Sequence, residues 1–249
     1  MSRYTAKRKS AAPTSSRKRK RVTNPLTARQ IKQIVNRIPG AEIKFYDTSL
    51  YDHALVSSAT CAGGEVNASS SISAVTIAQG DGESNREGRR CDVLSVNYKG
   101  CVSFTAQANQ TTADISPTVY IAMVLDKQTN GAEIVSEDVF QNPSGGTRLC
   151  TQPLTDLANQ KRYTVLKSWR LDTDTFASAY GGGSSYDVAG RHYSFNLYHK
   201  FKKPLRVTYG GTAENINIVA DNSVQLIAFA SATSAAPVIS YNSRTRFMG

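Results

Sequence analysis

The sequence has few of the residues that metal centres and redox sites use. It contains three histidines and four cysteines among 249 residues. The cysteines are scattered and form no Cys-x-x-Cys pair, so neither a zinc site nor a redox motif is indicated. We expect buried thiols at these four positions, because no secretion signal accompanies them. They are Cys61, Cys91, Cys101 and Cys150.

Long hydrophobic runs are also missing. No stretch approaches the roughly 18 apolar residues of a membrane-spanning helix. The longest apolar run, Val119–Leu125, has the length of a buried strand. No apolar segment follows the basic N-terminus, so we expect neither a secretory signal peptide nor membrane insertion.

Motifs for nucleophilic catalysis and nucleotide binding do not occur. There is no Gly-x-Ser-x-Gly and no P-loop lysine, and Gly80-x-Gly82 has Asn85 where the dinucleotide fingerprint needs its third glycine. His192 and His199 share a candidate strand, but residues seven apart point to opposite faces. We therefore predict no enzyme activity, no catalytic residue and no cofactor.

Four aspartates allow a weaker alternative. Asp172 and Asp174 would point the same way on an extended chain, and with Asp187 or Asp126 they could form a calcium site at a subunit interface. Solvated loop carboxylates account for the same residues without a metal. We favour that interpretation and predict no metal site.

Acidic residues are absent from the first 40 positions, where 12 of the 30 basic residues lie. The remainder holds 18 basic and 19 acidic residues. A nearly neutral body therefore follows a strongly cationic segment, which favours a polyanionic partner. The basic residues of this segment are Arg3, Lys7, Arg8, Lys9, Arg17, Lys18, Arg19, Lys20, Arg21, Arg29, Lys32 and Arg37.

Residues 1–23 are too polar to bury the surface that would offset their ordering entropy. We expect a disordered arm that neutralises nucleic acid without reading its sequence, since base readout needs a scaffold. The run Arg17–Arg21 is also typical of a nuclear-import signal.

Residues 24–40 are predicted to form a short basic amphipathic helix. Asn24 and Pro25 suit its start, and Pro39-Gly40 its end. The helix either only packs or also faces nucleic acid, and both interpretations stay open. Its apolar residues are Ile31, Ile34, Val35 and Ile38.

Residues 41–249 show strand periodicity interrupted by glycine-rich turns. Leu94, Val96, Tyr98, Val102 and Phe104 are predicted on one strand face. Tyr163, Val165, Trp169 and Leu171 are predicted on another, with Lys167 as an exception. Further predicted strands are Glu42–Leu55, Thr118–Asp126, His192–Phe201, Val224–Ala232 and Val238–Arg246, with a short helix near Ile134–Phe140.

About eight strands with long polar connections indicate an all-β fold, an eight-stranded jelly-roll sandwich. Connections as long as Val56–Ser71 and Thr173–Gly190 are expected to bind or assemble something, or to stay mobile.

The ordered set of motifs resembles capsid proteins of small circular Rep-encoding single-stranded DNA viruses, which are similar to geminivirus-like and satellite-virus coat proteins. Ser168 departs from the pattern, which has an acidic residue there. The segments that carry the resemblance are the basic arm, Glu42–Thr48, Gln79–Gly88, Val119–Lys127, Tyr163–Leu171, Asn222–Ala230 and Ser243–Phe247.

The resemblance implies a single jelly roll that self-assembles into a small icosahedral shell and packages single-stranded DNA. Its partners would be further copies of itself, single-stranded nucleic acid with DNA favoured, and the host's nuclear import machinery. It would occur in the virion and, during assembly, in the host nucleus. Roughly sixty copies would bring about 720 arm charges, matching roughly 700 phosphates one to one.

The body is expected to add basic residues to the shell interior. Phe201 is either a base-stacking residue or a core residue, and we favour the core. The predicted interior residues are Lys200, Lys202 and Lys203, with Arg86, Arg89, Arg90, Lys161 and Arg162 as further candidates.

Three alternatives to a DNA capsid remain. An RNA-packaging satellite-type coat protein has a similar shell. A monomeric nuclear nucleic-acid-binding protein with a basic tail would need a base-reading element, and the sequence offers none. A cupin-type enzyme or lectin would need clustered His and Glu ligands, which three scattered histidines do not provide.

Overall fold

A computed structural model describes residues 42–55, 73–104, 107–110, 118–134, 136–141, 154–172, 177–179, 186–188, 191–230 and 237–249. The chain divides between residues 40 and 41 into two units, and only the second contains described residues. The predicted arm (1–23) and linker helix (24–40) therefore lie outside the described residues and stay predictions. Residue 41 is also outside the described residues.

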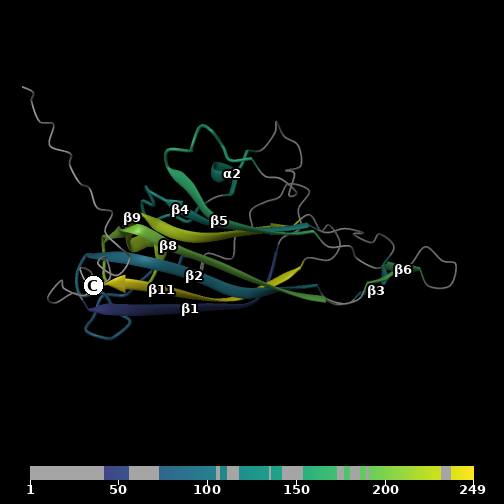
Figure 1. The fold of residues 1–249 in the computed structure, drawn as a ribbon, viewed down its shortest axis with the longest axis horizontal. Coiled ribbons are helices and arrows are strands. Elements are labelled where there is room, and N and C mark those ends of the chain that lie inside the picture. The colour runs from purple at the N-terminus through teal and green to yellow at the C-terminus, as the bar shows by residue number, and fades with distance from the viewer. Residues whose placement is uncertain are drawn as a thin grey trace, which may run out of the picture. The chain divides into compact units, whose positions relative to one another are not determined.

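The larger sheet has five antiparallel strands in the order β1-β11-β2-β8-β9 (Figure 1). These are β1 (Ile43–Ala54), β11 (Val238–Met248), β2 (Arg90–Phe104), β8 (Arg191–Tyr209) and β9 (Val219–Asp221). The first and last long strands of the body are thus neighbours.

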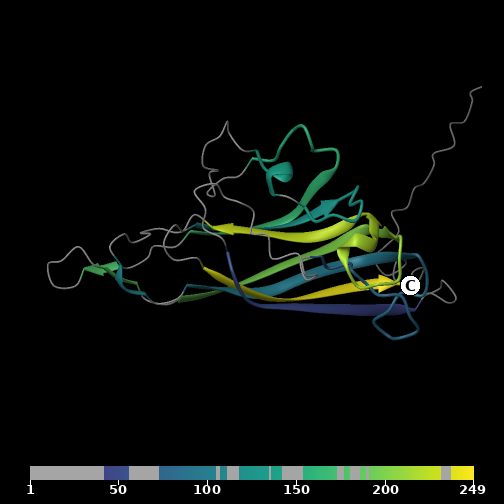
Figure 2. The same cartoon turned by 180° about the vertical axis from the view of Figure 1, so that it is seen from behind.

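A second sheet has the order β10-β4-β5, formed by β10 (Ser223–Ala230), β4 (Thr118–Asp126) and β5 (Tyr163–Asp172). It lies against one face of the five-stranded sheet in both views (Figures 1 and 2). The single-turn helix α2 (Ser136–Val139) lies on its other side.

The remaining elements are short. A third sheet has the order β3-β7-β6, with β3 (Gln107–Gln110), β7 (Tyr186–Val188) and β6 (Ala177–Ala179). A 3-10 turn, η1 (Ile216–Ile218), precedes β9. No helix in the described ranges is long and apolar enough to cross a membrane.

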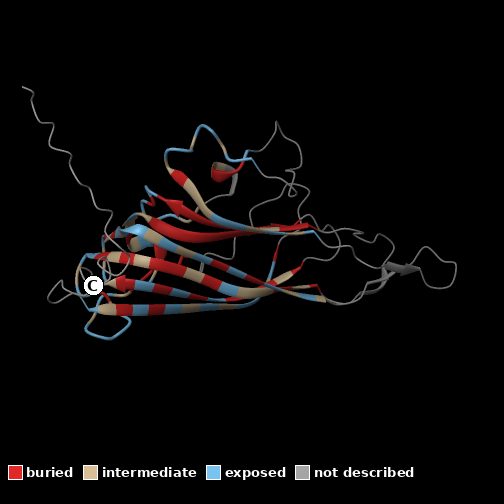
Figure 3. Cartoon of the chain, viewed as in Figure 1, coloured by how far each residue is buried: buried red, intermediate tan, exposed pale blue. Residues whose placement is uncertain are grey.

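The main core fills the space between the first two sheets. Every residue of β10 is buried, whereas β11 alternates between buried and exposed residues along its length (Figure 3). This difference arises because the β10-β4-β5 sheet is covered on both faces. Its outer face carries a second cluster in which Ala122, Val124 and Phe229 pack against Val139 and Phe140 of the α2 segment.

The all-β prediction is confirmed in this part of the chain. The structure forms β4 with the predicted bounds, Thr118–Asp126. Four other predicted strands are also present. Their ends are shifted by a few residues, and β8 extends to Tyr209. The predicted and observed strands correspond as follows: Glu42–Leu55 to β1, His192–Phe201 to β8, Val224–Ala232 to β10 and Val238–Arg246 to β11. The short helix near Ile134–Phe140 is α2.

Bulges make one prediction about strand faces wrong and another wrong at a single residue. In β2, Val96, Tyr98, Val102 and Phe104 are buried in the main core as predicted, and only Leu94 departs. The pairing of β2 with β8 shifts between Val93 and Ser95, so Val93 is fully buried whereas Leu94 is only half-buried. In β5 the register shifts at Leu166. An extra residue reverses the alternation of side chains.

Because of its bulge, β5 contributes side chains to both the main core and the outer cluster beside α2. Tyr163 and Val165 pack into the outer cluster with α2, whereas Trp169 and Leu171 pack between the two sheets. After the bulge, Lys167 lies on the same side of β5 as Trp169 and Leu171, and it is exposed there.

The turn after β4 has the conformation that its sequence predicts. Asn130 and Gly131 have φ values of 50° and 70°, and Ala132 N–H donates to Thr129 O across the turn at 3.0 Å. Positive φ at both central positions favours the Asn-Gly pair. A Cβ on Gly131 would also approach Asn217 O to 2.6 Å, so glycine is required there.

Candidate nucleic-acid interface

Of the residues predicted to bind nucleic acid, the 12 in the first 40 positions lie outside the described residues. The other three, Lys200, Lys202 and Lys203, are exposed on β8. The pairing of β2 with β8 skips from Leu205 to Lys200, so Lys202 and Lys203 belong to a wide bulge opposite Leu94. Phe201, in the same bulge, is half-buried against the main core, as favoured, and its ring meets that of His199 edge-on.

The prediction that Arg86 faces nucleic acid is wrong. Its side chain is fully buried, with Nε donating to Ile77 O at 2.9 Å and the two terminal nitrogens donating to Gly88 O and Gly211 O. The guanidinium carbon lies 4.0 Å from the centroid of the Tyr209 ring. Carbonyl dipoles and a π face therefore stabilise this charge within the glycine-rich turn, and it is closed to any ligand.

The other candidates outside β8 differ in their availability. Arg162 donates two hydrogen bonds of 2.9 Å to the fully buried Asp126 carboxylate, which raises the pKa of Arg162. This pair satisfies a buried charge and leaves Arg162 little freedom for phosphate. Arg89, Arg90 and Lys161 are exposed.

The aspartates considered for calcium are occupied by basic side chains where the structure describes them. Arg162 holds Asp126, and Arg170 binds Asp172 at 2.6 Å and lowers the pKa of that carboxyl through their hydrogen bond. Asp174 and the side chain of Asp187 lie outside the described residues. The described residues contain no group of three or more His, Cys, Asp or Glu that could hold a metal ion.

The solvent face of the five-stranded sheet gathers cations from four strands. The register places three cross-strand rows of four residues on this side. We call these twelve residues the open face, because no described element packs on it. The rows are Phe45–Arg246–Ser95–Lys200, Asp47–Arg244–Asn97–Tyr198 and Ser49–Asn242–Lys99–Asn196.

One acid and four bases give the open face its charge. Arg244 binds Asp47 through hydrogen bonds of 2.8 and 2.6 Å, and this contact lowers the pKa of the Asp47 carboxyl. Lys99, Lys200 and Arg246 are exposed and form no ion pair with another described residue. The open face therefore carries three uncompensated positive charges.

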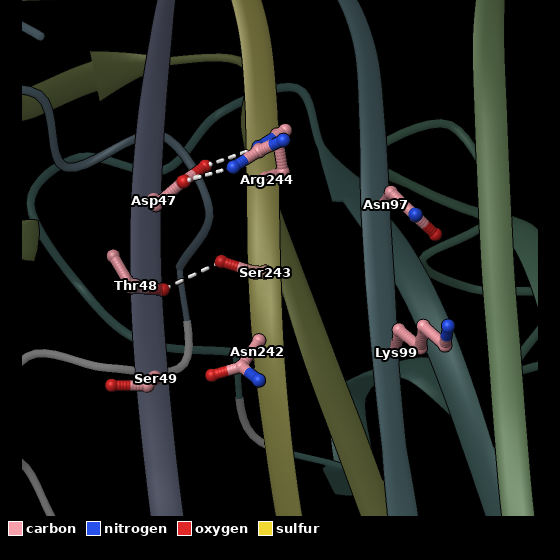
Figure 4. Close-up of a pocket in the computed structure, with 8 residues that line it drawn as sticks. All are labelled: Asp47, Thr48, Ser49, Asn97, Lys99, Asn242, Ser243 and Arg244. Carbon is pink, nitrogen blue, oxygen red and sulfur yellow. Dashed lines mark hydrogen bonds and ion pairs between the residues drawn. The ribbon is translucent and has the colours of Figure 1, made fainter.

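A pocket of about 370 Å³ opens among these residues. Figure 4 shows the Asp47–Arg244 pair on one side and Asn97 and Lys99 extending from β2 on the other. Within the described part of the chain, the Asn97 Oδ1 atom is buried without a hydrogen-bond partner, an uncommon condition for a polar atom. The pocket thus offers cationic donors from Lys99 and Arg244 beside polar side chains.

Sequence reasoning missed most of the open face. Lys200 was predicted, but Lys99, Arg244 and Arg246 were not, because they become neighbours of Lys200 only through the pairing of distant strands. The alternation Asn242, Arg244, Arg246 against buried Tyr241, Ser243 and Thr245 was the available signal for one solvent-facing cationic strand.

Comparison with known proteins assigns the chain to no group. No family model matches it, and no curated protein matches it.

Proposed function

We propose that this protein is a viral capsid subunit that self-assembles into a small icosahedral shell and packages single-stranded DNA through residues 1–40. The observation that carries the proposal is the division of charge: 12 basic residues and no acid in the first 40 positions, ahead of a body with 18 basic and 19 acidic residues. A nearly neutral body can contact copies of itself without strong repulsion, while the separate cationic segment neutralises phosphate.

The strand pairing supports an eight-stranded jelly roll for the body. β1 pairs with β11, Ser73 bridges to Gln225 of β10, β2 pairs with β8, and β4 pairs with β5. In these pairs the first strand is joined to the last, the second to the second-last, and so on inward. This nested pairing is expected when one long antiparallel hairpin rolls into two packed sheets.

The motif resemblance supports DNA as cargo and the nucleus as the place of assembly. Shell closure with roughly sixty copies would concentrate about 720 positive charges from residues 1–40, enough for roughly 700 phosphates. A longer genome needs further cations from the folded body, which the open face contains.

The proposal is tested by imaging purified full-length protein by negative-stain electron microscopy, with and without nuclease. We expect uniform closed particles that protect nucleic acid, and digestion of the extracted material by DNase I but not by RNase A. RNase-sensitive cargo would replace DNA with RNA and favour the satellite-type alternative. A monodisperse monomer at several salt concentrations and pH values would overturn the capsid proposal in favour of a monomeric nucleic-acid-binding protein.

Nuclear import has its own test, a fluorescent fusion of the full chain in host-type eukaryotic cells. Replacing Arg17–Arg21 by alanine should leave the fusion in the cytoplasm. The matched control replaces Lys7–Lys9, the other basic cluster, and should leave import largely intact. Unchanged nuclear accumulation of the first variant contradicts an import role for this run.

A further inference from the structure

The open face differs from every other broad surface of the two packed sheets. The outer side of the β10-β4-β5 sheet is covered by residues around α2, and the inner sides of both sheets form the core. On the open face, exposed residues alternate regularly with buried ones along β11 (Figure 3). A sheet face of this kind is a platform whose residues are fixed by the strand register.

The charge of the open face selects a polyanion. Lys200 and Arg246 lie in one row two strands apart, about 10 Å by the strand spacing, and Lys99 lies four residues farther along β2, about 14 Å from that row. A second copy of the same face would carry the same charge and be repelled. Flexible lysines and a free arginine are the donors that bind phosphate without base specificity.

Exposed aromatic rings add a second kind of contact. Tyr198 and Phe45 are 51% and 50% exposed, and the Arg244 guanidinium carbon lies 5.9 Å from the centroid of the Phe45 ring. Tyr198 lies between Lys200 and Asn196 along β8 and opposite Asn97. Aromatic rings interleaved with basic residues match bases stacked along a charged backbone.

The flat platform favours a single strand over a duplex. Major-groove recognition needs a helix or β-ribbon that enters the groove, and the open face has only sheet residues. Stacking on Tyr198 needs a base whose π face is free, which a continuous duplex does not offer. Lys99, which lines the pocket one residue pair away from that ring, supplies a cationic donor for a phosphate.

We propose that the open face is a second nucleic-acid site, in which Tyr198 stacks on an unpaired base while Lys99, Lys200 and Arg246 hold phosphates. This inference deepens the proposed function, and rests on it for the identity of the polyanion as packaged nucleic acid. It adds a single-strand preference that charge neutralisation by residues 1–40 would not supply.

The test measures the affinity of full-length protein for fluorescent oligo(dT) and for a duplex of equal length, over a range of salt concentrations. The oligonucleotide has about 20 nucleotides, a few times the smallest single-strand site sizes. The triple variant Lys99→Gln/Lys200→Gln/Arg246→Gln removes three charges from the open face. The matched control Lys127→Gln/Lys167→Gln/Arg170→Gln removes three exposed charges elsewhere. We expect the first to reduce the salt slope for oligo(dT) by about 2, since each phosphate contact adds about 0.7, and the control to change it by less than half as much.

Tyr198→Ala separates stacking from charge. We expect at least a fivefold loss of oligo(dT) affinity with an unchanged salt slope, and no loss for the duplex. Tyr51→Ala, which removes an exposed tyrosine outside the three rows, is the control and should change affinity less than twofold. Ultraviolet crosslinking of oligo(dT) followed by peptide mapping should place a crosslink on the peptide that contains Tyr198.

Equal effects of the two triple variants, together with no loss in Tyr198→Ala, overturn the inference. Electron microscopy of the same preparations keeps this result distinct from the proposed function. Filled shells formed by a protein whose open-face variants bind oligo(dT) normally would support the capsid proposal and overturn the second site. Tyr198-dependent binding by a protein that forms no shells would leave the site standing and overturn the capsid proposal.

Discussion

Replacement of the buried Arg86 is expected to destabilise the body strongly. In Arg86→Met the apolar stem is kept, but Ile77 O, Gly88 O and Gly211 O lose their donor. A buried carbonyl without a partner costs about 1–3 kcal/mol, and this applies in full to Ile77 O. The bonds to the other two are only part-buried, so water recovers much of their loss.

The net loss in Arg86→Met is therefore about 1–3 kcal/mol, because relief of the buried charge offsets the smaller losses at the other two carbonyls. Arg86→Lys keeps the charge but lacks the planar fork that reaches three carbonyls, so we expect about half that loss. The stacking on Tyr209 is weakened in both variants.

The assay is urea unfolding of full-length protein followed by fluorescence of Trp169, the single tryptophan, which packs beside Phe195 at 5.8 Å between the sheets. Subunit concentration is kept constant, since association adds to apparent stability. Arg89→Met, an exposed neighbour, is the control and should change the free energy of unfolding by less than about 0.5 kcal/mol. An Arg86→Met variant as stable as this control would refute the role assigned to the carbonyl cage.

Three further predictions test the sheet and its titrating groups. Gly100→Ala should cost about 1–3 kcal/mol in the same urea assay, because its Cβ would approach Ser240 O to 2.1 Å, whereas Gly88→Ala, with nothing within 4 Å, should be nearly neutral. Cys91, whose thiol pKa burial raises to about 11, should resist iodoacetamide at pH 8 until the protein unfolds, as read by peptide mass spectrometry; rapid native labelling would contradict its burial. Carboxyl NMR titration should find the pKa of Asp47 below its ordinary value of 3.8 and returned toward it in Arg244→Gln. Because the folded pKa is the lower one, the pair stabilises the fold above pH 4 and loses this effect as pH falls through the folded value.

Strand existence could be predicted from the sequence, because apolar alternation and glycine-rich turns are local signals. Thr118–Asp126 combines a continuous apolar run with flanking polar segments, and its bounds follow from that contrast alone. The bulges at Leu94 and Leu166 could not be predicted, since each arises from the fit between two strands that are distant in the sequence. A single extra residue there moves Trp169 and Tyr163 to opposite faces.

Arg86 shows a second limit of sequence reasoning. It lies in a polar, glycine-rich decapeptide, Gln79–Gly88, which suggests an exposed turn and an available charge. Its burial follows from three carbonyls that converge on the guanidinium. Gly88 O belongs to the decapeptide, Ile77 O comes from just before it, and Gly211 O comes from a turn 125 residues away. The direction of a backbone carbonyl is set by the backbone conformation, so it cannot be inferred from residue type.

The two basic regions of the chain would contribute differently to packaging. Residues 1–40 carry 12 charges with no acid among them, so their binding should be strong, salt-dependent and indifferent to strandedness. The open face contributes only three uncompensated charges, but Lys99 and Lys200 have strand-fixed positions beside Tyr198. Because stacking is insensitive to salt and needs an unpaired base, the preference for single strands should persist at salt concentrations where binding to the arm has weakened. A ratio of single-strand to duplex affinity that rises with salt in the full-length protein, and stays flat in Tyr198→Ala, is the signature of this division between a charged arm and a stacking platform.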